Sequence, residues 1–230
     1  EQKCYVPDLV FGQLLPSDNF SDAERQAVYG RTGYSAKLAN IFSRRFTVET
    51  LDSTRRRRYR QSWYSNTTER GEPEIQALAP GTSLEDFTCV TFEPDLVRFG
   101  MDRLEDDIVL LMRKRAYDIA TVTRGRCQVY LNDELIKVRS FEDYIAMYLE
   151  PETFRVSERC NECWEVGVAL TDDGSAFRHA SLVNCGSVAR GGTHVAYVTD
   201  QVVSAVCDYL SKHRASLGLG DKSGPLAVKR

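Results

Sequence analysis

The stretch GRTGYSAK, residues Gly30 to Lys37, combines residue types that can hold an anion. Gly30 and Gly33 lie in a loop that runs directly into a predicted helix opening near Ser35. Exposed backbone N–H groups and the positive end of the helix dipole favour an anion there, and Lys37 would add a positive charge. The stretch does not fit the Walker A pattern. It predicts phosphate binding, and the alternative is a tight turn that caps a core helix.

Cys160 and Cys163 form a C-x-x-C pair in a chain with seven cysteines. A zinc site needs four ligands, and the sequence offers no second pair at matching spacing. A redox dithiol needs a thioredoxin-like strand and helix around the pair, which the pattern lacks. We therefore expect neither a metal nor a redox role for this pair, in a reduced, intracellular protein.

Two basic clusters are candidates for contacts with nucleic acid. Five arginines lie between Arg55 and Arg60, where they could neutralise several phosphates, although we favour the solvated end of a hairpin. Lys212, His213 and Arg214 end a predicted helix, and basic residues also suit the negative end of a helix dipole. For this second cluster, DNA contact and helix capping both stay open.

The elements that position these residues follow from hydrophobic periodicity. In the first part we expect helices over 7–15 and from Ser35, a hairpin of strands over 46–50 and 61–64, a loop over 69–85, a third strand over 87–92 and a long helix over 104–122. In the second part we expect strands over 127–131 and 135–138 around an Asn132-Asp133 turn, a helix over 141–149, a hairpin of strands over 164–170 and 177–183, and a helix from His194 to about His213, with Thr193 as its cap. The boundary between two α+β units is expected near residue 123.

Composition limits the class of protein. The 230 residues are 42% hydrophobic and 27% charged, which is typical of a folded domain with a real core. The formal net charge of -3 excludes a globally basic nucleic-acid binder, so any DNA contact would be a local patch. No run approaches the roughly 20 apolar residues that a membrane span needs, and we expect no membrane partner. Because the chain begins at Glu1, we expect an excerpt of a longer protein.

An ordered series of motifs resembles one family. Seven stretches resemble the ATPase region of eukaryotic type IIA DNA topoisomerases. They are YVPDLVFGQLLPSDNF, GRTGYSAKLANIFSRRFTVET, RQSW, DFTCVTFEPDL, DDIVLLMRKRAYDIA, VYLNDELI and SLVNCGSVARGGTHVAYVTDQVV. The series extends from Tyr5 to about Lys212, so it is far more specific than one glycine loop. It implies an α+β fold. Residues 1–123 would be a partial GHKL (Bergerat) ATPase domain, and residues 124–230 a partial transducer domain of the ribosomal protein S5 domain 2-like class.

The resemblance also implies a function, namely part of an ATP-dependent type II DNA topoisomerase that uses ATP and Mg²⁺. In the family, two such modules form a homodimer on binding ATP and close a gate behind a captured double-stranded DNA, which passes through a break in another duplex. The implied location is the nucleus, or a mitochondrion or kinetoplast for a paralogue. The alternative is a GHKL-fold nucleotide-binding module without turnover, and the residues upstream of Glu1 would discriminate between the two.

The resemblance places nucleotide contacts in two stretches. Ser17, Asp18 and Asn19 match the family's S-S-N, with Asp18 in place of the second serine. The family's lid loop, G-R-N-G-Y-G-A-K, is matched by Gly30, Arg31, Thr32, Gly33, Tyr34, Ser35, Ala36 and Lys37. Thr32 and Ser35 depart from it. If position 35 needs a positive φ, serine costs about 1 kcal/mol, and if it is the helix N-cap, serine is favoured.

DNA contacts are implied for Ser211, Lys212 and His213, where Ser211 replaces a family lysine. In the family, the general base, the magnesium-binding Asn and the adenine-reading Asp precede the segment that begins at Glu1. The catalytic Lys of a Q-T-K loop follows the segment that ends at Arg230. We therefore expect no catalytic and no metal-binding residue within the chain, which should be inactive by itself.

Overall fold

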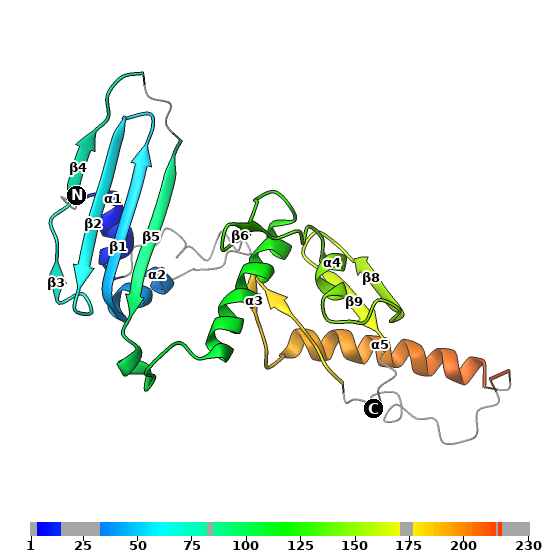
Figure 1. The fold of residues 1–230 in the computed structure, drawn as a ribbon. Helices are drawn as coiled ribbons and strands as arrows, with labels where there is room; N and C mark the ends of the chain where they lie inside the picture. Colours follow the sequence, from blue (N-terminus) through cyan, green and yellow to red (C-terminus); the bar gives the residue numbers. More distant parts are fainter. Residues whose placement is uncertain (1–3, 15–32, 82–84, 171–176, 215, 218–230) are drawn as a thin grey trace. The chain divides into compact units, whose positions relative to one another are not determined.

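The computed structural model describes residues 4–14, 33–81, 85–170, 177–214 and 216–217 (Figure 1). The chain divides into two compact units, residues 1–106 and 107–230. Helix α3 (Asp106–Thr123) therefore lies almost wholly in the second unit, whereas the boundary expected from the sequence falls at its end, near residue 123. The ATPase and transducer domain limits of 1–123 and 124–230 stay a prediction.

The first unit is built on an antiparallel sheet. Its strands are β1 (Ser43–Asp52), β2 (Arg57–Tyr64), β3 (Glu69–Arg70), β4 (Glu74–Ala77) and β5 (Phe87–Pro94). The order is β3-β2-β1-β5, and β4 also pairs with β2 (Figure 1). The predicted hairpin and third strand are confirmed. The loop expected over 69–85 is wrong in part, because β3 and β4 gain strand structure by pairing with the edge of β2 rather than from their own residue types.

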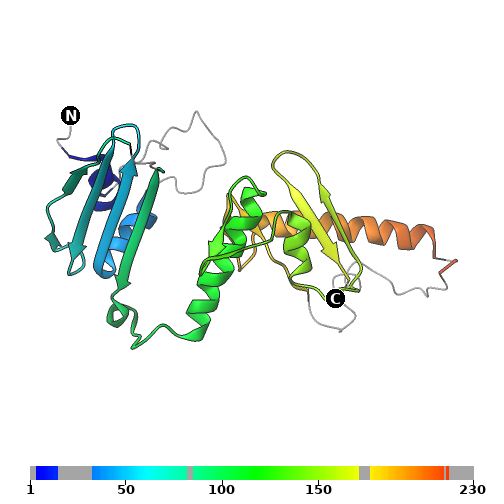
Figure 2. The ribbon, with the colours of Figure 1, turned by 45° about the horizontal axis from the view of Figure 1, so that its top comes forward.

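Two helices cover one face of this sheet, α1 (Val6–Gly12) and α2 (Tyr34–Ile41), as Figures 1 and 2 show. Phe46, Val48 and Trp63 form the buried core, and Phe11 of α1 and Ala39 of α2 pack against it. Phe46 lies opposite Trp63 across the β1–β2 ladder, with ring centroids 6.1 Å apart. Burial of these large rings holds both helices on the sheet. A 3-10 turn, Leu96–Phe99, follows β5.

The described part of the second unit contains α3, two further helices and three two-stranded sheets. Its elements are β6 (Tyr130–Leu131), β7 (Glu134–Leu135), α4 (Phe141–Ala146), β8 (Arg155–Arg159), β9 (Glu165–Ala169), β10 (Leu182–Val183), β11 (Gly186–Ser187) and α5 (Thr193–Lys212). The Asn132-Asp133 turn is confirmed, with both residues at positive φ between β6 and β7. The long helices expected over 104–122 and 194–213 are also confirmed. The N-cap of α5 is Gly192 rather than Thr193.

The hairpin expected from strands over 164–170 and 177–183 is wrong. β9 pairs instead with β8, and only Leu182–Val183 of the second segment is a strand, paired with β11. A tight turn decides this pairing, because Asn161 Oδ1 accepts hydrogen bonds from the backbone N–H groups of Cys163 and Trp164. The C-x-x-C pair lies in this turn, and both thiols are free and exposed.

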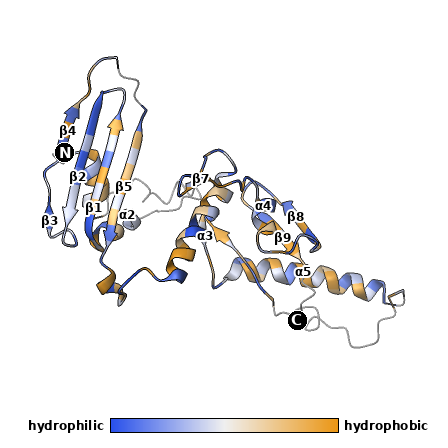
Figure 3. Ribbon diagram, viewed as in Figure 1, coloured by the Kyte–Doolittle hydropathy of each residue, from blue (hydrophilic) through white to orange (hydrophobic). Residues whose placement is uncertain are grey.

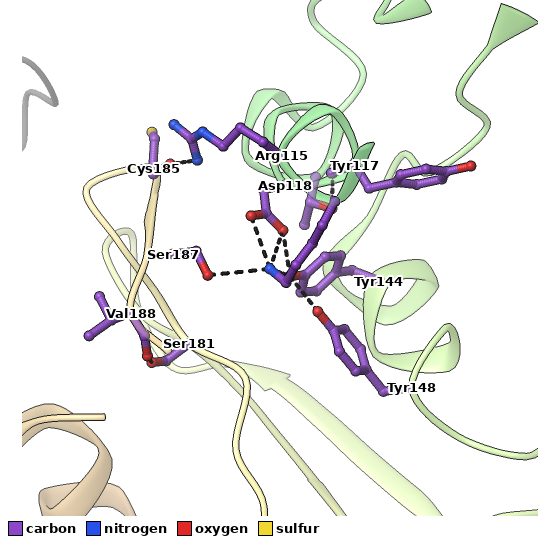
Figure 4. Close-up of polar contacts among 11 residues, drawn as sticks. Arg115, Tyr117, Asp118, Tyr144, Tyr148, Ser181, Cys185, Ser187 and Val188 are labelled. Atoms are coloured by element: carbon purple, nitrogen blue, oxygen red, sulfur yellow. Dashed lines mark hydrogen bonds and ion pairs between the residues drawn. The ribbon is translucent and has the colours of Figure 1, made fainter. Parts of the chain in front are cut away.

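A buried polar cluster joins three segments of the second unit (Figure 4). Asp118 of α3, 1% exposed, accepts a 2.6 Å hydrogen bond from the Tyr144 hydroxyl of α4 and pairs with Lys114 Nζ at 2.9 Å. Lys114 also donates to Ser187 Oγ of β11 at 3.3 Å. Because the single Tyr144 proton goes to Asp118, Tyr148 donates to the Tyr144 oxygen. The cluster fastens α3 to α4 and to the β10–β11 hairpin.

Hydropathy is distributed unevenly over the elements (Figure 3). β2 carries mostly hydrophilic residues, whereas apolar residues are frequent along α5. Within the described part of the chain, no helix has both the length and the apolar character needed to cross a membrane.

Candidate functional site

The structure describes part of the predicted anion-binding stretch. Ser17, Asp18, Asn19, Gly30, Arg31 and Thr32 lie outside the described residues. Gly33 is the N-cap of α2 in the left-handed conformation, with φ 65°, which glycine adopts at little cost. Ser35 lies inside the helix, so it needs no positive φ and does not cap the helix. Ser35 is therefore neither a position of positive φ nor the N-cap, because Gly33, two residues earlier, takes both roles.

Lys37 lies in the first turns of α2 and is almost fully buried, with 3% of its surface exposed. Its Nζ donates to the Gly33 carbonyl oxygen at 3.1 Å, which holds the ammonium group at the start of the helix. Burial lowers the pKa of this amine. A poorly hydrated cation beside a helix N-terminus attracts an anion more strongly than one in bulk water.

A pocket of about 380 Å³ lies between the end of α1 and α2. Its lining residues are Phe11, Gly12, Gln13, Leu14, Lys37, Asn40, Ile41 and Thr67. Asn40, 1% exposed, donates from Nδ2 to the Phe11 carbonyl at 3.0 Å, and its Oδ1 has no hydrogen-bond partner in the described structure. The pocket thus combines a buried cation with a buried acceptor that lacks a donor.

These groups fit one part of a nucleotide. Lys37 and the helix start suit a phosphate group, and Asn40 Oδ1 suits an N–H or O–H donor on the same ligand. Among the described residues, no group of three or more His, Cys, Asp or Glu side chains is placed to hold a metal ion. Sequence reasoning missed Asn40. The available signal was an amide on a helix face otherwise formed by Ala36, Ala39 and Ile41.

Three of the five arginines in the run at the β1–β2 hairpin pair with two acids. Arg55 pairs with Asp52 at 2.6 Å, and Arg58 and Arg60 both approach Glu49, at 2.5 and 3.9 Å. Exposed pairs of this kind add little stability, but they offset the positive charge that a DNA patch would need. We therefore interpret this run as the solvated end of a hairpin.

The second basic cluster lies at the end of α5. Lys212 is the last helical residue and is exposed, and the His213 ring stacks on Tyr209 with centroids 4.2 Å apart. The Ser211 hydroxyl donates to the Cys207 carbonyl at 2.7 Å. The structure brings Ser211, Lys212 and His213 together on the terminal turn, where capping and DNA contact are both compatible with the geometry.

The structure defines a two-unit α+β chain whose first unit places a buried lysine and a pocket beside the start of a helix. No family model matches the chain. The chain is 42% identical over 219 residues to DNA topoisomerase 2 of Bombyx mori, and 41% identical over 218 residues to human DNA topoisomerase 2-alpha. Each match covers 92% of this chain and 14% of the relative, so the chain spans about one seventh of the length of these curated proteins.

Two solved structures extend the comparison. The ATPase region of Saccharomyces cerevisiae topoisomerase II superposes with a TM-score of 0.80 at 41% identity, over 90% of this chain and 54% of that one. The ATPase and transducer domains of DNA topoisomerase II from Balamuthia mandrillaris give 0.80 at 39% identity, over 93% and 53%. Over its length the chain belongs with part of the ATPase and transducer region of eukaryotic DNA topoisomerase II, about half of each of these solved chains. This finding confirms both the resemblance and the α+β fold class.

Proposed function

We propose that the chain is part of an ATP-dependent type II DNA topoisomerase, in which the first unit forms one wall of the nucleotide site. The observation that carries the proposal is the buried Lys37 ammonium at the start of α2, beside a pocket with an unpaired acceptor. The identity of about 40% to DNA topoisomerase 2 over 92% of the chain supports it.

Lys37 would bind the phosphate chain by exchanging its hydrogen bond to the Gly33 carbonyl for one to a phosphate oxygen. Its ammonium donates to the Gly33 carbonyl, and a phosphate oxygen is a stronger, charged acceptor for the same proton. Gly33 turns the backbone so that the first N–H groups of α2 face the same anion. ATP, bound with Mg²⁺, supplies the hydrolysable phosphate chain. The described residues bind and orient it, and the general base is expected from another part of the full-length protein.

The remaining parts of the proposal concern partners and location. Two copies of the module would form a homodimer on binding ATP and close around double-stranded DNA in the nucleus. Ser211, Lys212 and His213 would contact the DNA backbone, and the residues outside the structure, Ser17 to Asn19 and Gly30 to Thr32, would complete the nucleotide contacts. A module without turnover is less well supported, because Ser35 lies in ordinary helix and no longer argues for a damaged lid.

The test is a Lys37→Ala substitution in the full-length protein, measured as dimer closure on a non-hydrolysable ATP analogue. We expect closure to need at least about tenfold more analogue, because a desolvated charge-assisted contact contributes roughly 1.5–3 kcal/mol. Lys137→Ala, at an exposed lysine, is the control. Normal closure of the Lys37 variant would show that the proposed phosphate contact is wrong.

A further inference from the structure

Asn40 supplies the unpaired acceptor of the pocket, but it is not among the residues proposed above to bind the phosphate chain. It follows Lys37 by three positions on α2, so both side chains lie on the same face of the helix, and both line the pocket. Burying this amide at 1% exposure with Oδ1 lacking a hydrogen-bond partner destabilises the folded state. A ligand whose N–H or O–H group donates to Oδ1 would offset this destabilisation.

The other half of the amide joins two elements. Nδ2 donates to the carbonyl of Phe11, in the last turn of α1, where backbone carbonyls lack partners within the helix. Phe11 and Gly12 form one wall of the pocket, and Lys37 and Asn40 form another. The single bond of 3.0 Å therefore sets how far the end of α1 lies from the lysine.

We propose that Asn40 is a positioning residue of the nucleotide site. Through the Phe11 carbonyl it fixes the pocket wall opposite Lys37, and its free Oδ1 accepts a hydrogen bond from an N–H or O–H group of the nucleotide. This inference rests on the proposed function. It adds a residue that governs nucleotide affinity and that takes no part in the chemical step.

The experiment measures the ATPase kcat and KM, and the affinity for a non-hydrolysable ATP analogue, in the full-length protein with Asn40→Ala. We expect KM and Kd to rise about tenfold, as is typical when a residue that orients a ligand-binding group is lost. The kcat should stay within about twofold, because Asn40 is not expected to touch the reacting phosphate. Asn40→Leu keeps nearly the same volume and removes both polar atoms, so it should give the same result if the alanine variant folds poorly.

Gln61→Ala is the matched control. Gln61 is also 1% exposed and also donates to a backbone carbonyl, that of Gly71 at 2.9 Å, but it does not line the pocket. It should lower thermal stability to a similar degree and leave KM unchanged. An equal rise of KM in the Asn40 and Gln61 variants, or no rise in either, would overturn the positioning role. A wild-type protein that binds no nucleotide would instead refute the proposed function itself.

Discussion

Tyr59 shows how a single buried hydroxyl responds to its surroundings in the first unit. The residue is 7% exposed, and its hydroxyl donates to Gln61 Oε1. Burial, and then the negative charge of Asp8, raise the pKa of Tyr59 to about 12. Asp8 is itself 1% exposed and paired with Arg70 at 2.6 Å.

A raised pKa means that the folded state holds the proton more tightly than the unfolded chain does. The stability from Tyr59 should therefore be complete below pH 10.0, the ordinary value, and be lost as pH rises toward about 12. We expect Tyr59→Phe to cost about 1 kcal/mol at pH 8, since Gln61 loses its donor. This difference should shrink between pH 10 and 12. Urea unfolding of the wild-type and Tyr59→Phe proteins between pH 8 and 12 measures this difference. Tyr64→Phe, at a half-exposed neighbour, is the control. A difference independent of pH would contradict the assignment.

At the scale of elements, the Asp118 cluster holds α3 in the second unit. Tyr144→Phe removes the 2.6 Å hydrogen bond to a buried carboxylate and should destabilise the unit by about 1–3 kcal/mol. Asp118→Ala removes the shared acceptor of Lys114 and the Tyr144 hydroxyl, and it should cost more, about 3 kcal/mol. Hydrogen exchange of α3 amides measures both. Tyr148→Phe is the conservative control, because its hydroxyl contacts only that of Tyr144 among the contacts in Figure 4. Equal effects of the two Tyr→Phe changes would contradict this account.

The elements that the sequence predicted correctly are those with a strong pattern of their own. α3 repeats apolar residues at helical spacing, and β1 and β5 alternate. β3, β4 and β8 were missed because they are short or charged, and a partner strand supplies their stability. The site follows the same rule. Lys37 stays a prediction that its glycine loop suggested, whereas the hydrogen bond of Asn40 depends on Phe11, which lies 29 positions earlier and meets it only in the folded structure.

At the scale of the whole molecule, a net charge of -3 requires that any DNA contact be local. Two acids beside the arginine run at the β1–β2 hairpin offset part of its charge, whereas Lys212 is exposed at the end of a 20-residue helix. Such a helix is about 30 Å long, and its terminal cation can reach a phosphate backbone beyond the body of the unit. The end of α5 is also the candidate for DNA contact that the resemblance to the family implies.

Lys212→Glu in the full-length protein should weaken DNA binding to a similar degree for all sequences, because a phosphate contact carries no base information. Loss of one phosphate contact lowers the slope of log K against log salt concentration by about 1. Lys137→Glu makes the same change of charge at another exposed lysine of the second unit and should leave the slope nearly unchanged. Binding isotherms at several salt concentrations measure both variants. Equal slopes would assign Lys212 to helix capping, since the change of net charge alone would then account for the weaker binding.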